Sequence, residues 1–245
     1  MSEPDVFFGR EKVAAHEKTA RVNAIFDTVA SRYDIMNDFM SFGTHRLLKR
    51  LVVESAAIRP GHHVLDAAGG TGDIAQLLSR AVGQDGHVTC FDLSEGMLQV
   101  GRDRAIDAGY GSIRFAQADA QQLPFQSDVF DAVTIGFGLR NIADQHKALN
   151  EFRRVLRHGA RLVILDFSQP TNSALRAAYG LFKQTWPLVG QLIVGAAQPY
   201  RYLVDSIETH PAQSVLALML QDCGFKNVHY DNLLGGIAAL HWGTA

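Results

Sequence analysis

Apolar residues recur along this chain with two periods, and the change of period separates predicted strands from predicted helices. Short apolar runs predict five strands, near 62–66, 87–91, 113–117, 130–135 and 160–167. Between these runs, apolar positions at helical spacing predict helices near 73–82, 94–108 and 144–155. Strands that alternate with helices are typical of βαβ units, so we expect a parallel sheet with helices on both faces.

The N-terminal part of the chain departs from this alternation. Apolar residues at helical spacing from Val22 to Tyr33 predict one helix. A second helix is expected to follow Thr44, which we interpret as its N-cap. The chain therefore begins with two helices before the sheet.

The C-terminal part departs as well. An apolar stretch near 174–202 predicts an inserted helical cap. A helix from about Pro211 to Gln221 then precedes two closing strands, 225–230 and 234–240, which are close enough in sequence to pair as a hairpin.

We therefore expect an α/β fold with a doubly wound, mostly parallel sheet of seven strands and a C-terminal antiparallel hairpin, a Rossmann-like arrangement. The 245 residues are expected to form a single domain. Its predicted parts are the N-terminal helices at 1–56, a ligand-binding core at 60–170, the helical cap at 171–205, and the closing helix and hairpin at 206–245.

Composition narrows the class of protein only slightly. With 47% hydrophobic and 20% charged residues and a formal net charge of −2, the chain has no basic surface excess that would indicate nucleic acid. Cys90 and Cys223 are too far apart in sequence to suggest a disulfide framework or a metal site, so we expect two buried thiols and no metal. The sequence has neither a signal-peptide pattern nor an apolar run of the ~20 residues that span a bilayer, which predicts a cytoplasmic protein.

The strongest single motif is the run from Val64 to Asp73, in which an apolar strand passes into a glycine turn. Glycines allow positive φ and bring backbone N–H groups close to a ligand, and the following helix points its positive end at the same place. Gly70, Gly72 and Ala75 also satisfy the spacing of a nucleotide-binding dehydrogenase. Asp66 at the strand end favours a different ligand, because it would repel a pyrophosphate but attract the ammonium group of S-adenosylmethionine.

Two further acids follow the next strands. Asp92 lies ~20 residues beyond the glycines, where a ribose-binding carboxylate is expected. Asp119 and Ala120 follow the third strand, where an acid can accept a hydrogen bond from an adenine amino group. Each acid taken alone could equally cap the helix or turn that follows it.

Three longer stretches are more specific. They are Tyr33-Asp34-Ile35-Met36-Asn37-Asp38 with Ser41 and His45, Gly136-Phe137-Gly138-Leu139-Arg140-Asn141, and Tyr200-Arg201-Tyr202-Leu203. Through them the chain resembles the UbiE type of ubiquinone and menaquinone biosynthesis C-methyltransferase, with the fold of the class I S-adenosylmethionine-dependent methyltransferases. The resemblance extends from about Phe7 to Trp242. It implies methyl transfer from S-adenosylmethionine to a ring carbon of a polyprenylated quinol, either a methoxy-benzoquinol or demethylmenaquinol.

The motifs and the resemblance together assign the cofactor contacts. The expected residues are Asp66, Gly69, Gly70, Thr71, Gly72, Asp92, Leu93, Met97, Asp119, Ala120 and Gly136. Three places depart from the family pattern, and one of them is His158-Gly159-Ala160, where Pro-Gly-Gly is usual. Glycine stands at 136 where members carry serine, and Leu48 stands where tryptophan is usual.

Methylation of a quinol carbon requires the neighbouring hydroxyl to approach a phenolate. Arg140 is the candidate for stabilising this oxyanion, and Asn141 for orienting the oxygen or a water. Alternatively, Arg140 pairs with a carboxylate such as Asp166 and Asn141 caps the next helix. His45 is the candidate base or quinol ligand, with a packed histidine as the alternative.

The remaining candidates concern the substrate and its partners. Tyr33, Asn37 and Tyr202 are expected to wall the quinol pocket, although Tyr33 also fits an apolar core face. The predicted cap could line a channel for the prenyl tail, touch a membrane surface, or form a homodimer or complex interface. Two competing functions are a non-catalytic adenosyl-ligand-binding subunit and an NAD-dependent dehydrogenase.

Overall fold

The computed structural model describes residues 5–30, 37–38, 41, 43–193, 195 and 197–245. Its main sheet has seven strands in the order β5-β4-β3-β6-β7-β9-β8. They are β3 (His63–Ala67), β4 (His87–Asp92), β5 (Arg114–Gln117), β6 (Phe130–Gly136), β7 (Leu156–Phe167), β8 (Lys226–Leu233) and β9 (Ala238–Thr244). Strands β3 to β7 are parallel, and β9 is antiparallel to both β7 and β8. The predicted fold class is therefore confirmed.

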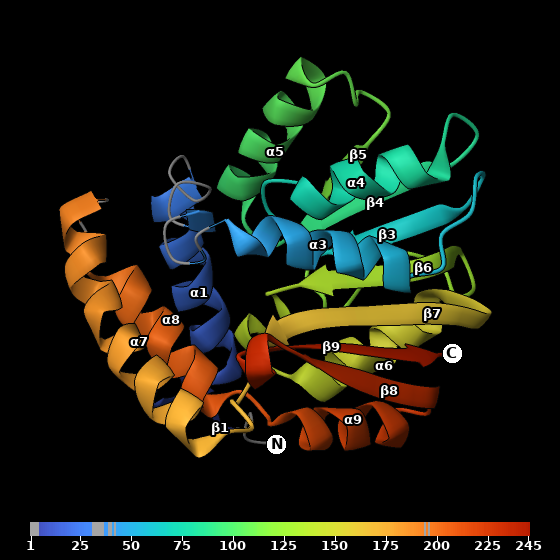
Figure 1. Ribbon diagram of the computed structural model, residues 1–245. Coiled ribbons are helices and arrows are strands. Elements are labelled where there is room, and N and C mark those ends of the chain that lie inside the picture. The colour runs from blue at the N-terminus through green and yellow to red at the C-terminus, as the bar shows by residue number, and fades with distance from the viewer. Residues whose placement is uncertain (1–4, 31–36, 39–40, 42, 194, 196) are drawn as a thin grey trace.

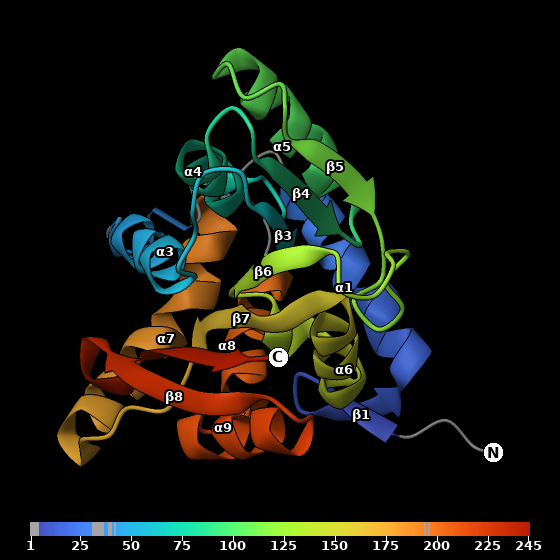
Figure 2. The ribbon, with the colours of Figure 1, turned by 90° about the vertical axis from the view of Figure 1, so that its right-hand side faces the viewer.

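Helices cover both faces of this sheet (Figures 1 and 2). One face carries α3 (Thr44–Ser55), α4 (Asp73–Val82) and α5 (Glu95–Asp107), and the other carries α6 (Gln145–Val155) and α9 (Gln213–Asp222). The alternating direction of side chains along a strand explains why the sheet has a core on each face. Val64 and Leu65 of β3 are fully buried, and each packs into a different core cluster because successive side chains point to opposite faces.

Three other helices gather beyond the edge where the parallel strands end, namely α1 (Ala15–Val29), α7 (Ser173–Ile193) and α8 (Gln198–Thr209) (Figure 1). Helices α7 and α8 pack together through a small aromatic core that includes Tyr179, Trp186 and Tyr200. Ligands of open α/β sheets bind outside the carboxyl ends of the strands, so these helices cover the place where a ligand is expected.

The N-terminal region differs from the all-helical prediction for 1–56. A two-stranded antiparallel hairpin, β1 (Asp5–Phe8) and β2 (Glu11–Ala14), precedes α1. Helix α1 ends at Val29, and Tyr33 lies outside the described residues. The predicted N-cap at Thr44 is also wrong, because Gly43 takes this position with a left-handed φ of 73° that suits glycine.

Three elements in the C-terminal half, two strands and one helix, begin at other residues than predicted. Strand β9 begins at Ala238 because a 3₁₀ turn over Leu234–Gly236 makes the connection from β8. Helix α9 begins at Gln213, two residues after Pro211. Strand β7 begins at Leu156, directly after α6, rather than near residue 160.

Candidate active site

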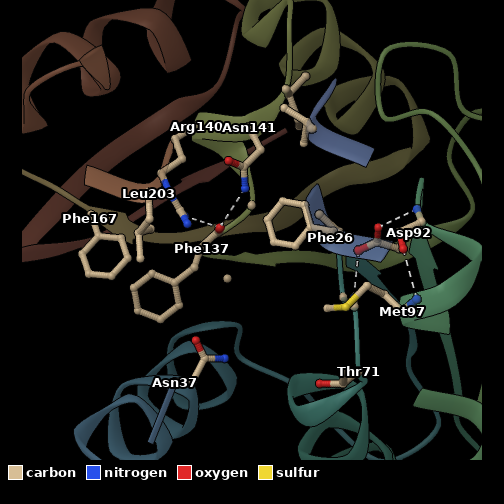
Figure 3. Close-up of a pocket in the computed structure, with 18 of the residues that line it drawn as sticks. Phe26, Asn37, Thr71, Asp92, Met97, Phe137, Arg140, Asn141, Phe167 and Leu203 are labelled. Atoms are coloured by element: carbon tan, nitrogen blue, oxygen red, sulfur yellow. Dashed lines mark hydrogen bonds between the residues drawn. The ribbon is translucent and has the colours of Figure 1, made fainter. Parts of the chain in front are cut away.

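A cavity of about 450 Å³ lies at the carboxyl edge of the sheet, under α1, α7 and α8. Its lining divides into two halves (Figure 3). We call the part near Gly70, Asp92 and Met97 the cofactor half, and the part near Arg140 and Phe167 the substrate half.

The glycine turn of the cofactor half is held by backbone contacts. The Gly69 N–H donates to the carbonyl oxygen of Phe91 at 3.0 Å, and the Gly72 N–H donates to that of Gly69 at 2.9 Å. Gly101 of α5 lies against this turn, since a Cβ at position 101 would come within 2.9 Å of the Gly70 carbonyl oxygen. Sequence reasoning missed Gly101, and a glycine inside a predicted helix was the available signal for a close backbone approach.

Asp92 is the best-placed acid of the cofactor half. Its two carboxylate oxygens accept hydrogen bonds from the N–H groups of Gly70 and Ser94, each at 2.9 Å. Burial raises the pKa of the Asp92 carboxyl, although these N–H groups oppose the shift. Met97 lies on the same side of the glycine turn, because a Cβ at Gly70 would come within 2.9 Å of the Met97 Cε and 3.8 Å of the Asp92 Oδ2. The Asp92 side chain is thus fixed at the cavity wall, and its carboxylate oxygens can accept further hydrogen bonds.

The ends of β4 and β5 contribute further lining residues at the positions expected from the sequence. Asp119, Ala120 and Leu93 all line the cavity. The Asp119 carboxylate accepts a hydrogen bond from the Gln121 N–H at 2.8 Å and two from the Gln121 side-chain amide at 3.1 Å. Asp119 therefore also stabilises its own turn, the alternative role considered for such acids.

Asp66 does not line the cavity, and its expected contact with a ligand stays a prediction. It is fully buried beneath the turn, where Thr134 donates a hydrogen bond to its Oδ1 at 2.9 Å. Its Oδ2 has no partner among the described residues. Burial raises the pKa of the Asp66 carboxyl to about 7. Gly72 is likewise not a lining residue, because it faces Phe115 of β5 instead.

Two lining positions show how the family departures fit. Gly136 and Leu48 both line the cavity. A Cβ at position 136 would come within 2.4 Å of the Ile74 Cδ1, so an isoleucine methyl group occupies the room that a serine side chain would need. Leucine in place of a larger indole at 48 leaves more space in the same wall.

Arg140 lines the substrate half and is paired, as the alternative interpretation held. Its Nη1 lies 2.8 Å from the Asp166 Oδ1, and both side chains are almost completely buried. The same nitrogen donates to the Phe137 carbonyl oxygen, and the guanidinium lies 5.1 Å from the centre of the Phe167 ring. The Arg140 Nε has no partner among the described residues. The pairing therefore leaves donor capacity on the guanidinium.

Asn141 and Tyr202 are brought together across 61 positions of sequence. The Tyr202 hydroxyl donates to the Asn141 Oδ1 at 3.1 Å, and both residues line the cavity. The Asn141 amide nitrogen lies 3.5 Å from the Phe137 carbonyl oxygen, toward which Arg140 also points (Figure 3). Asp144, not Asn141, caps helix α6, so that alternative for Asn141 is wrong.

His45 and Asn37, which precede β3 in the chain, line another part of the cavity wall. The His45 Nε2 lies 2.8 Å from the Asp38 Oδ1, and its Nδ1 is buried without a partner among the described residues. His45 is almost completely buried, in keeping with the alternative of a packed histidine, yet it lines the cavity. Asn37 also lines it.

The apolar lining of the substrate half was predicted only in part, because Tyr179, Phe182 and Trp186 belong to the stretch that could line a tail channel. It includes Phe26, Val29, Phe137, Phe167, Tyr179, Phe182, Trp186 and Leu203, which come from five separate segments. Their spacing matches core-facing helical or strand positions, so no local signal distinguished them from ordinary core residues. Within the described part of the chain, no group of three or more His, Cys, Asp or Glu residues could hold a metal ion.

Comparison with solved structures shows the class of fold. A SAM-dependent methyltransferase from Aquifex aeolicus superimposes with a TM-score of 0.59 at 18% identity, over 80% of this chain and 88% of the other. Phosphoethanolamine N-methyltransferase 2 from Haemonchus contortus, solved with S-adenosyl-L-methionine, superimposes with a TM-score of 0.59 at 14% identity, over 80% and 52%. The fold is therefore that of a class I methyltransferase.

Comparison of sequences shows the family. The ubiquinone/menaquinone biosynthesis C-methyltransferases UbiE of Teredinibacter turnerae and Methylococcus capsulatus are 48% and 47% identical to this chain. These alignments cover 97% and 99% of this chain, and 96% and 99% of the relatives. The model of the ubiE/COQ5 methyltransferase family matches residues 14–245. The chain belongs to the ubiE/COQ5 methyltransferase family.

Proposed function

We propose that this methyltransferase uses S-adenosylmethionine to methylate a ring carbon of a polyprenylated quinol, either demethylmenaquinol or a polyprenyl-methoxy-benzoquinol. One observation carries the proposal. A single cavity joins an acid-lined half, with Asp92 and Asp119, to an apolar half that holds Arg140 and Asn141. A polar cofactor and an apolar aromatic substrate can therefore meet inside it.

The residues of the cofactor half fit S-adenosylmethionine. Asp92 retains acceptor capacity for two neighbouring ribose hydroxyls, and Asp119 retains it for an adenine amino group. Beneath the turn, burial raises the pKa of Asp66 to about 7, and the ammonium of a bound methionine moiety would favour its ionised form. When bound, S-adenosylmethionine supplies the methyl group from a sulfonium.

In the substrate half, we assign Arg140 to the quinol oxygen. A phenol has a pKa of ~10, and a nearby guanidinium lowers it by stabilising the phenolate. Asp166 fixes the orientation of the guanidinium, and Arg140 lines the cavity. Asn141, held by Tyr202, orients the same oxygen or an intervening water.

Methyl transfer breaks the bond between sulfur and the methyl carbon and forms a bond from that carbon to the ring. The phenolate electrons enter the ring as the new bond forms. When the ring carbon then loses its proton, the electron pair of the broken C–H bond restores aromaticity and regenerates the phenolate. We assign the proton to His45, which lines the cavity and whose imidazole is oriented by the contact of its Nε2 with Asp38. Closure by α1, α7 and α8 excludes water from the reaction.

The test is methyl transfer from labelled S-adenosylmethionine to short-tailed forms of both quinols, each kept reduced. Mass spectrometry should locate the new methyl group on a ring carbon. Cofactor binding without transfer to either quinol would instead support the non-catalytic binding subunit. Protection against thermal unfolding by NAD but not by S-adenosylmethionine would overturn both the methyltransferase and the binding-subunit functions.

We further propose that the outer side of α7 rests on a lipid surface while the tail of the substrate enters. Leu181 and Leu188, one heptad apart on this helix, are 67% and 71% exposed, and α7 lies on the outer side of its group with α1 and α8 (Figure 1). No helix in the described part of the chain has the length and apolar composition to cross a bilayer. Contact would therefore be interfacial.

Liposome flotation tests this contact. The double variant Leu181→Ser, Leu188→Ser should lose flotation, whereas Val215→Ser, Leu218→Ser on α9 removes similarly exposed side chains and should not. Equal flotation of both variants would contradict contact through α7. Failure of the wild-type protein to float, together with dimer dissociation in the α7 variant alone, would identify a homodimer interface instead.

A further inference from the structure

A buried lysine contacts the turn that carries Arg140 and Asn141. Lys18, near the beginning of α1, is only 6% exposed. Its Nζ lies 3.1 Å from the carbonyl oxygen of Ile142 and 3.3 Å from that of Arg140. Lys18 itself does not line the cavity. Its side chain therefore acts on the backbone of the turn and not on a ligand.

An ammonium group is costly to bury unless it is compensated. No carboxylate lies within ion-pair distance of Lys18 among the described residues, and burial lowers the pKa of the Lys18 amine to about 8. Its compensation comes from carbonyl groups at the end of the 3₁₀ turn Leu139–Asn141, which lack partners within the turn. Lysine and turn thus satisfy one another, so loss of either leaves buried polar groups unpaired.

Helix α1 is fastened at its other end to the cofactor half. The Ser94 hydroxyl donates to the Asp27 carboxylate, while the Ser94 Oγ accepts the Met97 N–H as the cap of α5. Between these two attachments, Val22, Asn23 and Phe26 line the cavity. Helix α1 therefore connects the Arg140 turn, through Lys18, to the cofactor half, through Asp27.

We infer that Lys18 is a positioning residue for the methyl transfer, which holds the Arg140–Asn141 turn at the cavity wall through its two carbonyl contacts. This inference rests on the proposed role of Arg140. Displacement of the turn moves the guanidinium and the Asn141 amide away from the quinol oxygen, and small misplacements of this kind reduce rate strongly. It leaves the glycine turn and Asp92 in place.

Two variants of Lys18 separate hydrogen bonding from a general packing role. Lys18→Met keeps the volume and removes the donors, whereas Lys18→Gln keeps an NH₂ donor without the charge. Lys147→Met removes an exposed lysine near the same turn and serves as the control. For each purified variant, kcat, the Kd for S-adenosylmethionine and backbone amide exchange by mass spectrometry are measured.

We expect Lys18→Met to lower kcat by about tenfold or more, a factor corresponding to one hydrogen bond with a charged donor, with the cofactor Kd within about twofold of wild type. Amide exchange should accelerate in the peptide covering 136–145 and stay unchanged over 66–76. Lys18→Gln should recover part of both effects. Unchanged exchange at 136–145 in Lys18→Met, or a parallel loss of cofactor affinity, would overturn the inference.

Failure of the proposed function gives a different pattern. If Arg140→Ala keeps full turnover, the role assigned to Arg140 is wrong, yet exchange at 136–145 still reports whether Lys18 holds the turn. If Arg140→Lys loses turnover while Lys18→Met retains it, Arg140 keeps its role and only the positioning role of Lys18 fails.

Discussion

The two halves of the cavity are built in different ways. The cofactor half comes from three consecutive strand ends, and backbone N–H groups hold its key acid, as at Gly70, Ser94 and Asp92. The substrate half is held mainly by side chains from distant segments, such as the pair Arg140–Asp166. Backbone at a strand end has little freedom, whereas the substrate half depends on how separate helices pack. We therefore expect changes in the first half to alter cofactor affinity, and changes in the second to alter rate.

The largest expected effect is on rate in the substrate half. Arg140→Ala should lower kcat by about 10² to 10³, a range typical for loss of a donor to a developing oxyanion. The Kd for the cofactor should stay unchanged in calorimetry. Because the substitution leaves Asp166 buried without its cation, Arg140→Lys is measured beside it. Arg157→Ala removes an exposed arginine paired with Asp131 and should act like wild type. Equal losses of rate and affinity in both Arg140 variants would remove the distinction between the halves.

The next effect concerns affinity in the cofactor half. Gly101→Ala adds a methyl group within 2.9 Å of the Gly70 carbonyl oxygen and 3.1 Å of the Thr71 carbonyl carbon. Overpacking of about 1–3 kcal/mol should weaken cofactor binding by roughly 5- to 150-fold. At saturating cofactor, kcat should be largely retained.

Gly180→Ala is the matched control, since Gly180 also lies inside a helix and has open space around its Cβ position. It should bind the cofactor normally and be slightly more stable, as alanine favours a helix. Normal cofactor affinity in Gly101→Ala would show that the glycine turn does not depend on this close approach.

A third prediction concerns pH dependence beneath the cofactor half. Burial raises the pKa of Asp66 from 3.8 to about 7, so the folded protein binds the proton more tightly than the unfolded chain. The contribution of Asp66 to stability is therefore present at low pH and is lost as the pH rises through about 7. The stability difference between wild type and Asp66→Asn should fall by at most about 1.4 kcal/mol per pH unit between pH 4 and 7.

Denaturant unfolding across pH measures this difference. Asp131→Asn provides the opposite sign, because Arg157 and the His63 N–H lower the pKa of Asp131, whose contribution is lost as the pH falls. Parallel pH curves for wild type and Asp66→Asn would mean that Asp66 is ionised in the folded protein throughout.

The smallest effect lies where the halves meet. Gly136→Ser should strain the contact with Ile74, whose Cδ1 occupies the required space. Ile74→Val removes that methyl group and should relieve the strain, at its own cost of about 0.5–1.5 kcal/mol in stability. A double-mutant cycle should show favourable coupling of about 1 kcal/mol between the two substitutions. Additive effects would place the serine side chain away from Ile74.

Much of the fold was predictable because its signals are local. Apolar runs marked the parallel strands, and the glycine turn after β3 marked the start of α4 at Asp73. The hairpin before α1 was not, since a two-stranded hairpin is marginal alone and this one packs Phe8 on Tyr202 of α8, far away in sequence. The start of β9 was not either, because the turn Leu234–Gly236 precedes it. The side-chain direction of Asp66 was similarly hidden, because a residue at a strand end can face the ligand or the layer beneath it.

By itself, the sequence determined the order of the elements, the glycine turn and the acids at three strand ends, and its longer motifs pointed to the family. Periodicity and backbone conformation are properties of neighbouring residues, so they can be predicted from the chain. Only the tertiary structure decided that Arg140 pairs with Asp166, that Tyr202 holds Asn141, and that Lys18 reaches the same turn. Such contacts join residues far apart in sequence, and they exist only once the sheet and the helices over its edge are packed.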